Sequence, residues 1–328
     1  MLCNTGVRLC AFSSALSLSV ILLACSSGID SDDDGDELPQ GNSACETASS
    51  VASEVQVVAV PPTGQLYHGV FPGGHEEWGE EDDLTLQDVQ SYEQVAGKSV
   101  AWVYFSHNWF RDHAFPEATV QWIRTSGSTP FIRLMLRSSA EQNLSEPTYT
   151  LQRIIDGDFD GDLCGWAQAA RDNGGPLLVE FGTEVNGQWF SWNGVWNGGE
   201  QTGGYGDGSL ADGPERFRDA YRHIVNLMQS QGAYNMLWVF HVDAQDVPED
   251  DWNRFENYYP GDDWIDWVGV SVYGAAEPTD DEWIEFRQPM DDVYSRLVAL
   301  TEKPIAVLEF GVTDGNPNGD RRVGPERL

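Results

Sequence analysis

The sequence predicts an α/β fold built on parallel strands, organised as a (β/α)8 barrel. Seven short apolar runs, several of them almost continuously apolar, alternate with longer amphipathic segments between about residues 64 and 311. Continuous apolar runs are typical of parallel strands covered on both faces, and strand–helix alternation indicates a parallel sheet. The number of runs favours the barrel over a six-stranded doubly wound sheet.

The predicted elements follow one another in a regular order. The strands are expected at residues 65–71, 99–106, 129–136, 176–182, 235–242, 266–274 and 304–311. Residues 164–174, 213–232 and 288–303 place apolar side chains at helical spacing, and the first two of these segments end at glycine. The glycine-rich stretch 193–213 is expected to be a long loop after the fourth strand, on the face where barrels keep their sites.

The N-terminus has the composition of an export signal. One arginine, Arg8, precedes an apolar run from about residue 11 to residue 24 that is short for a membrane-spanning helix. Residues 22–25, "LLAC", resemble a bacterial lipobox, which predicts signal cleavage before Cys25 and lipidation of that cysteine. Plain secretion is the alternative. Residues 26–50 are expected to be an acidic flexible linker and residues 51–328 the barrel domain, so the protein is expected at the cell envelope or outer membrane.

Charge and cysteine content limit the partners. A formal net charge of −35 and a pI of about 4.1 exclude nucleic acid and anionic membrane surfaces, because like charges would repel them. The expected contact with a membrane is the lipid anchor alone, and a monomer is expected.

An exported compartment permits a disulfide between Cys45 and Cys164. We expect no cofactor and no metal: residues 156–162, "DGDFDGD", begin like a calcium loop, but Ala167 stands at the twelfth position.

Two glutamates stand where a barrel would bring them together. Glu184 lies just past the fourth apolar run and Glu309 at the end of the seventh, and the C-terminal ends of barrel strands share one mouth. A pair of carboxyl groups suits glycoside hydrolysis, because one protonates the leaving oxygen while the other attacks the anomeric carbon. With 53 acidic residues in the chain, ordinary surface acids are the alternative.

The residues around both glutamates resemble glycoside hydrolase family 26. "EVNGQWFSW" at 184–192 resembles the acid/base motif Glu-Met-Asn-Gly-x-Trp-Phe-x-Trp that follows strand four of that family. "DWVGVSVYG" at 266–274 resembles the sixth strand with its tyrosine, and "KPIAVLEFG" at 303–311 the seventh strand with the nucleophile. Residues 157–178 and 217–243 resemble the segments on either side of the acid/base motif. The resemblance extends over about residues 64–315.

This resemblance implies a retaining, endo-acting glycosidase. Glu184 would be the general acid/base and Glu309 the nucleophile, oriented by a hydrogen bond from Tyr273. Trp189 would form part of the sugar platform, because indole faces stack on the apolar faces of pyranose rings. Further candidates for substrate contact are Trp192, Asn108, Trp109 and His241. Core packing is the alternative for the three tryptophans and for Asn108.

The expected substrate is a β-linked polysaccharide, with mannan preferred. Mixed-linkage glucan and xylan are alternatives, as is a catalytically impaired lipoprotein that only binds carbohydrate. The family usually has Arg-Pro-x-His-Glu at its acid/base, whereas residues 180–184 here read Glu-Phe-Gly-Thr-Glu. The loss of the histidine, here Thr183, weakens the prediction of mannan specificity more than that of the reaction.

Glu180 replaces the arginine of the family motif. Residues 180, 182 and 184 of a strand would share one face, so Glu180 is expected to point into the barrel below Glu184. A buried carboxylate needs a partner, and we hypothesise Arg133 or Arg137. Only 19 residues follow Glu309 in the chain of 328, too few for an eighth strand and its helices, so the barrel is predicted to be truncated after strand seven.

Overall fold

The computed structural model describes residues 45, 53–73, 83–274 and 284–311. The predicted signal segment, Cys25 and most of the acidic linker lie outside the described residues. Within residues 83–274 and 284–311, six strands form one parallel sheet in the order β1-β2-β3-β4-β5-β6. Their bounds are β1 Trp102–Asn108, β2 Thr129–Met135, β3 Leu177–Phe181, β4 Met236–Asp243, β5 Trp267–Tyr273 and β6 Ile305–Gly311.

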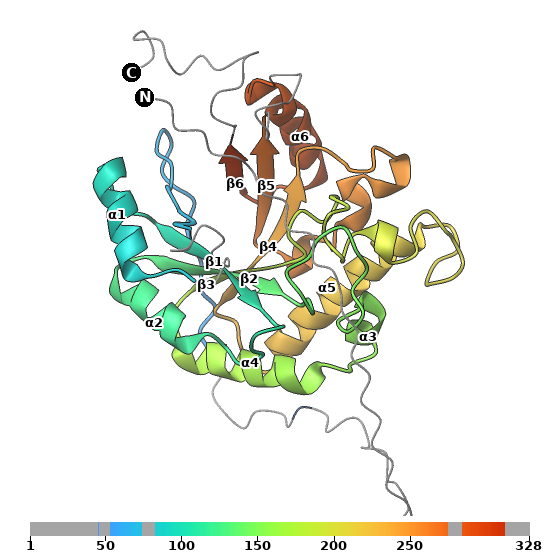
Figure 1. The fold of residues 1–328 in the computed structure, drawn as a ribbon, viewed down its shortest axis with the longest axis horizontal. Helices are drawn as coiled ribbons and strands as arrows, with labels where there is room; N and C mark the ends of the chain where they lie inside the picture. Colours follow the sequence, from blue (N-terminus) through green and yellow to red (C-terminus); the bar gives the residue numbers. More distant parts are fainter. Residues whose placement is uncertain (1–44, 46–52, 74–82, 275–283, 312–328) are drawn as a thin grey trace, which may run out of the picture. The chain divides into compact units, whose positions relative to one another are not determined.

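The six strands curl into a half-barrel with helices around it, which confirms the predicted α/β barrel class (Figure 1). The first predicted strand is the exception. Residues 65–71 contribute only one parallel bridge, from Val70 to Val103 of β1. Leu66 is 92% exposed and Phe71 44% exposed, so this run lacks the cover on both faces that a central parallel strand requires. The prediction of seven strands is therefore corrected to six strands and a bridge.

Helices connect the strands on the outside of the sheet (Figure 1). They are α1 Leu86–Ala96, α2 Glu117–Thr125, α3 Leu151–Ile155, α4 Asp160–Asn173, α5 Asp212–Ser230 and α6 Arg287–Leu300, with short 3-10 turns η1 Gly194–Trp196, η2 Asp251–Asn253, η3 Phe255–Tyr258 and η4 Asp262–Trp264. The three helices expected from apolar spacing correspond to α4, α5 and α6. No described helix has the length and apolar character that crossing a bilayer demands.

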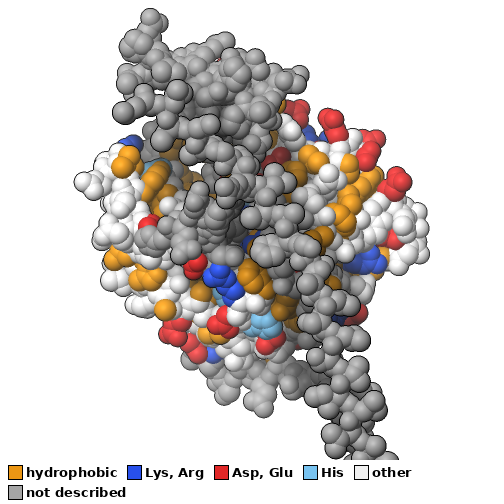
Figure 2. Space-filling model, in the orientation of Figure 1, with side chains coloured by type: hydrophobic (Ala, Val, Ile, Leu, Met, Phe, Trp, Pro, Cys, Tyr) orange, Lys and Arg blue, Asp and Glu red, His pale blue; other side chains and the backbone are white. Residues whose placement is uncertain are grey.

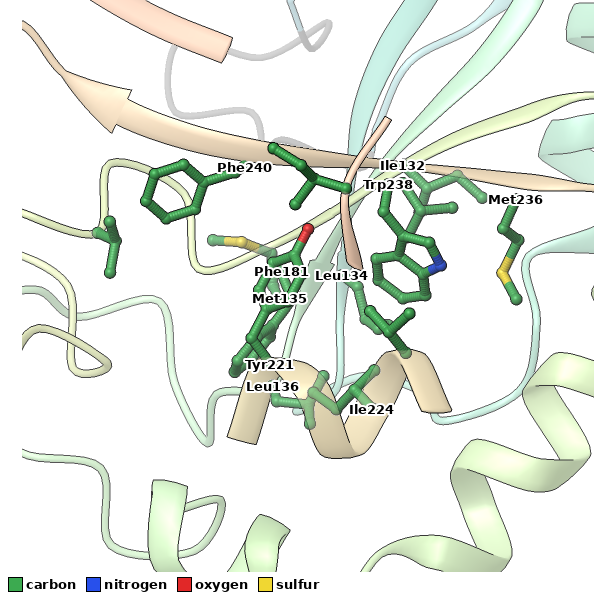
Figure 3. Packing of buried hydrophobic residues seen from close by; sticks show 14 of the residues in the cluster. Ile132, Leu134, Met135, Leu136, Phe181, Tyr221, Ile224, Met236, Trp238 and Phe240 are labelled. Carbon is green, nitrogen blue, oxygen red and sulfur yellow. The ribbon is translucent and has the colours of Figure 1, made fainter. Parts of the chain in front are cut away.

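The main core lies between the outer face of the sheet and the helices. Figure 3 shows side chains from β2, β3 and β4 packed against Tyr221 and Ile224 of α5. Ile132, Trp238 and Phe240 are among them, and each is at most 1% exposed. Burial of such side chains removes apolar surface from water and provides the main stabilising contribution to the fold.

The inner face of the sheet carries a second, smaller apolar cluster. It consists of Tyr104, Phe131, Leu178, Leu237, Val239 and Trp267, with Trp102, Ala306 and Leu308 packed against it. Because side chains alternate along a strand, the next inward positions lie toward the C-terminal ends. Those positions are polar: Arg133 in β2, Glu180 in β3, His241 in β4 and Ser271 in β5.

Two further features concern the outside of this unit. The sulfur atoms of Cys45 and Cys164 are joined as a disulfide, which fixes residue 45 to α4. Figure 2 shows acidic side chains at several separate places on the visible surface rather than in one patch.

Candidate active site

Glu184 projects from a tight turn that follows β3. The strand ends at Phe181, so Glu184 does not continue the strand alternation expected for residues 180, 182 and 184. Gly182 has φ +79°, and a Cβ there would lie 2.3 Å from the ring of Phe217. Glu184 itself has φ +48°, a left-handed conformation that residues with a Cβ adopt rarely and that is concentrated at functional sites. The turn, not the strand pleat, directs Glu184 to the mouth.

The Glu184 carboxyl group is nearly buried and held by an indole. The side-chain N–H of Trp189 donates to Glu184 Oε2 at 2.7 Å. Gly187 makes room for this arrangement, because a Cβ at that position would lie 2.2 Å from the Trp189 ring. Burial, and next the negative charge of Glu309, raise the pKa of Glu184 above its ordinary value. A carboxyl group in this setting is prepared to carry a proton.

Glu309 reaches the same mouth from β6 through an irregularity in the sheet. The register between β5 and β6 shifts, so that Val270 pairs with Val307 but Ser271 pairs with Glu309. Leu308 is the extra residue, and it packs in the inner apolar cluster. A bulge of this kind lets the side chains of two consecutive residues, Leu308 and Glu309, both lie on the inner face of the sheet.

The two oxygens of Glu309 have different environments. The Tyr273 hydroxyl donates to Oε2 at 2.9 Å, and burial followed by the charge of Glu309 raises the pKa of Tyr273. Arg133 Nη2 lies 3.6 Å from Oε1. Oε1 accepts no hydrogen bond from the part of the chain that the structure describes. One oxygen is therefore oriented by a tyrosine, while the other forms an ion pair with a guanidinium and accepts no hydrogen bond from the described residues.

The two glutamates are close neighbours. One carboxylate oxygen of Glu184, one of Glu309 and one ring nitrogen of His241 lie within 4.8 Å of one another. Paired carboxyl groups of retaining glycosidases stand roughly 5–5.5 Å apart. The arrangement therefore has the separation at which one group can protonate a leaving oxygen while the other attacks from the opposite side.

A second charged layer lies beneath the pair, centred on fully buried Glu180. Its carboxylate lies 3.0 Å from His241 Nδ1 and 3.4 Å from Arg133 Nε, and it accepts hydrogen bonds from the hydroxyls of Thr183 and Tyr104. Burial alone would raise the pKa of Glu180, but the charge and hydrogen bond of His241, with smaller contributions from Arg133 and Thr183, lower it. Glu180 therefore stays ionised. The hypothesis of an arginine partner holds for Arg133.

Comparison with known proteins identifies the family. A model of glycosyl hydrolase family 26 matches residues 137–317, more than half of the chain.

The chain belongs to glycosyl hydrolase family 26.

Two curated relatives are bacterial proteins. Endoglucanase H of Acetivibrio thermocellus is 25% identical over 238 residues, which cover 72% of this chain and 24% of that protein. A mannan endo-1,4-beta-mannosidase of Bifidobacterium adolescentis is 25% identical over 166 residues, which cover 49% of this chain and 14% of that protein. The chain thus spans a quarter or less of the length of either relative.

Solved structures support the fold. A Bacillus subtilis mannanase matches with a TM-score of 0.50 at 19% identity, over 71% of this chain and 68% of that one. The family 26 domain of an endo-beta-mannanase/endo-beta-glucanase from Prevotella bryantii matches with a TM-score of 0.50 at 15% identity, over 74% and 76% of the two chains.

Within this family 26 chain, His241 does not occupy the position expected from the sequence. It was expected to face the mouth as a substrate contact, but its side chain is fully buried. Nδ1 pairs with Glu180 and Nε2 lies 2.9 Å from the Ser271 hydroxyl, so both ring nitrogens are engaged. Burial alone would lower the pKa of His241, but the charge and hydrogen bond of Glu180 raise it. The structure thus places His241 beside the two glutamates, as a buried group beneath the surface of the site.

Three other predicted substrate contacts are also buried. Trp192 is 3% exposed, stacks on Phe190 with ring centroids 4.6 Å apart, and donates its N–H to the Thr183 carbonyl at 2.8 Å. Asn108 is buried and accepts a hydrogen bond from Arg137 at 2.8 Å. Trp109 is 1% exposed and stacks on a histidine. Their burial favours core packing, the alternative given for these residues. Trp192 instead supports the turn that carries Glu184.

Sequence reasoning did not single out Ser271 or Asp243. Ser271 stands two residues before Tyr273 on the same face of β5, so strand alternation was the signal that could have found it. Asp243 ends β4 two residues after His241. Burial, and next the charge of Glu184, raise the pKa of Asp243 to about 7. The site thus holds a third carboxyl group that changes charge near neutral pH.

The geometry gives no reason to assign a metal. Glu184, His241 and Glu309 could in principle share an ion, but both nitrogens of His241 are already engaged. The calcium-like stretch 156–162 runs from the C-terminal end of α3 into the first turn of α4. Its carboxylates pair with different side chains: Asp156 with Gln152, Asp158 with Arg153, Asp160 with His223 and Asp162 with His113. They do not converge on one point.

Proposed function

We propose that the protein is a retaining, endo-acting β-glycosidase that cleaves a β-linked polysaccharide, with a mannan as the preferred substrate. The observation that carries this proposal is the pair Glu184 and Glu309, with carboxylate oxygens within 4.8 Å across the mouth of the half-barrel. Membership of glycosyl hydrolase family 26 supports the reaction class.

Each step of the proposed reaction has a residue suited to it. Glu184, with its raised pKa, gives its proton to the glycosidic oxygen as the bond to the anomeric carbon breaks. Oε1 of Glu309, which no described group hydrogen-bonds, attacks that carbon from the opposite face and forms a glycosyl ester. The Tyr273 hydroxyl donates to Oε2 of Glu309 and Arg133 pairs with its Oε1, so both orient Glu309 beforehand.

The second half of the reaction uses the same groups in reverse. Glu184, now a carboxylate, takes a proton from water as the water oxygen attacks the anomeric carbon. The ester bond to Glu309 breaks and its carboxylate is restored. Two inversions at the anomeric carbon leave the product with the configuration of the substrate.

Release of reducing ends from mannan, mixed-linkage glucan and xylan tests the proposal. Glucan belongs in the panel because one relative is named an endoglucanase. We expect Glu184→Gln and Glu309→Gln to lose at least about a thousandfold in rate, while thermal unfolding shows both variants folded. NMR of the newly formed anomer should show retention. Full activity in either variant would refute the assignment, and binding of a glycan without hydrolysis by the wild type would favour the carbohydrate-binding alternative.

We also propose that Cys25 carries a lipid that anchors the protein to the cell envelope. Support comes from "LLAC" at residues 22–25 and the acidic linker that follows. Labelled fatty acid should be incorporated into the full chain expressed in a bacterial host and not into Cys25→Ala. Release of the unlabelled wild type into the medium would contradict the proposal.

A further inference from the structure

Three buried side chains form a continuous row beneath Glu184, one from each of three neighbouring strands. Glu180 of β3 lies 3.0 Å from His241 Nδ1, and His241 Nε2 lies 2.9 Å from the hydroxyl oxygen of Ser271 in β5. All three residues are 0% exposed. A ring nitrogen of His241 lies within 4.8 Å of a carboxylate oxygen of Glu184. Hydrogen bonding by Ser271 is among the influences that lower the pKa of Glu184.

We propose that Glu180, His241 and Ser271 act as a hydrogen-bonded relay that positions the carboxyl group of Glu184 and stabilises its ionised form. The three are positioning residues, since none of them touches the reacting atoms. The proposal rests on the proposed role of Glu184 as general acid/base, and it goes beyond that role by assigning what controls the acid.

The direction of the hydrogen bonds follows from the charge at the buried end of the row. Burial alone would lower the pKa of His241, but the ionised carboxylate of Glu180 raises it and favours the imidazolium form. An imidazolium donates from both nitrogens, so Nδ1 donates to Glu180 and Nε2 to the Ser271 oxygen. The hydroxyl hydrogen of Ser271 is then left to donate toward the Glu184 carboxyl group, whose pKa hydrogen bonding by Ser271 lowers.

The direction of these hydrogen bonds matters because Glu184 must be protonated at the start of a turnover and ionised after the first step. Burial and the nearby charge of Glu309 favour the protonated form, which the first step requires. The charge of His241 and the donor of Ser271 act in the opposite sense and lower the pKa of Glu184. The relay therefore makes Glu184 a stronger acid and stabilises the carboxylate left after proton release. No proton needs to move along the row.

Other charged or polar groups face Glu184 or the row and stay in place when Ser271 is changed. They are Tyr104 of β1, Arg133 of β2, Asp243 of β4, Tyr273 of β5, Glu309 of β6 and Trp189. Arg133 in particular contacts both Glu180 and Glu309, so it couples the two layers without Ser271. Substitution of Ser271 alone therefore disrupts the relay while leaving these other interactions with Glu184 and the row in place.

The test is the pH dependence of kcat/KM on the polysaccharide that the wild type hydrolyses. Its basic limb reports the pKa of the acid in the free enzyme. Ser271→Ala removes one donor to the carboxylate, so we expect the basic limb to move upward by roughly one pH unit. His241→Gln removes the positive charge as well and should move it further. Ser128→Ala is the matched control, because Ser128 is a buried serine that donates to the Val100 carbonyl at the opposite end of β2.

A second measurement does not depend on activity. The carboxyl carbon of Glu184 in 13C-labelled protein, assigned by its loss in Glu184→Gln, should titrate at higher pH in Ser271→Ala than in the wild type and in Ser128→Ala. Coincident titrations and coincident basic limbs would overturn the relay. If the titration shifts but the wild type hydrolyses no β-glycan, the relay stands and the proposed function fails. If the wild type hydrolyses a glycan and neither measurement shifts, the function stands and the relay fails.

Discussion

The two faces of the same sheet are built on opposite principles. On the outer face, β2, β3 and β4 present apolar side chains to α5, and any similar apolar set of the right volume would serve. On the inner face, the strands begin with apolar residues and end with Arg133, Glu180 and His241, all buried. The outer face therefore needs only apolar side chains of suitable shape and volume. On the inner face, each buried charged side chain needs one specific partner of opposite charge.

The largest effect on stability is expected from breaking the inner charge set. Glu180→Gln keeps the shape but leaves His241 and Arg133 without their shared carboxylate. Removing one partner of a buried charge pair typically costs about 3–5 kcal/mol, and the free energy of unfolding in urea measures it. Asp291→Asn is the matched control, since Asp291 pairs with Arg287 at the surface of α6 and its loss should cost about 1 kcal/mol or less. Equal losses of unfolding free energy in the two variants would show that the buried charge set contributes no more to stability than the control ion pair.

An apolar deletion on the outer face should separate stability from catalysis. Ile132→Ala removes a fully buried side chain of β2 and leaves a cavity, which should cost about 3 kcal/mol. Because Ile132 points away from the mouth, the activity of the folded fraction should remain near that of the wild type. Denaturant unfolding and kcat at a temperature where the variant is folded check the two parts. A large loss of kcat in fully folded protein would show that the faces are not independent.

A smaller change tests how the bulge aims Glu309. A Cβ at Gly269 would lie 2.3 Å from Leu308 Cδ1, so Gly269→Ala must displace Leu308. We expect a loss of about 1–3 kcal/mol in unfolding free energy from overpacking, together with a lower kcat because Glu309 follows Leu308. Gly165→Ala in α4 has open space at that Cβ and should leave both quantities nearly unchanged or improve stability. A normal kcat in Gly269→Ala would show that the bulge tolerates the shift.

The most gradual effect concerns pH, because it is spread over several pH units. The pKa of Asp243 is raised to about 7, so ionising it disfavours the folded state. Its contribution to stability is full below the pKa of the unfolded chain, about 4, and is lost as the pH rises through about 7. Asp243→Asn should lack this loss, which amounts to at most about 1.4 kcal/mol per pH unit. Melting temperatures between pH 4 and 8 check it, and parallel profiles for variant and wild type would contradict the assignment.

The same contrast explains what could be predicted from the sequence. Apolar runs predicted the strands of the sheet because a strand buried on both faces has an uninterrupted run of apolar residues. The prediction of a strand around Val70 was wrong because this run is not covered on both faces. Strand ends predicted the neighbours Glu184 and Glu309. The buried partner of Glu180 could be narrowed only to two arginines, because pairing within the mouth depends on side-chain reach.

Other features of the site could not be predicted from the pattern of residues along the sequence. Strand alternation placed His241 on the inner face but could not tell that Glu180 and Ser271 would occupy both its nitrogens. The bulge at Leu308 and the left-handed turn at Glu184 depend on backbone conformation, and neither residue type signals it.

That turn has a consequence for how the chain could change over time. Holding a residue with a Cβ in the left-handed region costs roughly 1–2 kcal/mol, and only glycine escapes the penalty. Burying an ionisable carboxyl group there adds a further cost. If folding were the sole requirement, glycine would be the better residue at position 184, and drift would favour it once activity ceased to matter. Glutamate at position 184 therefore carries two costs to stability that glycine at the same position would avoid.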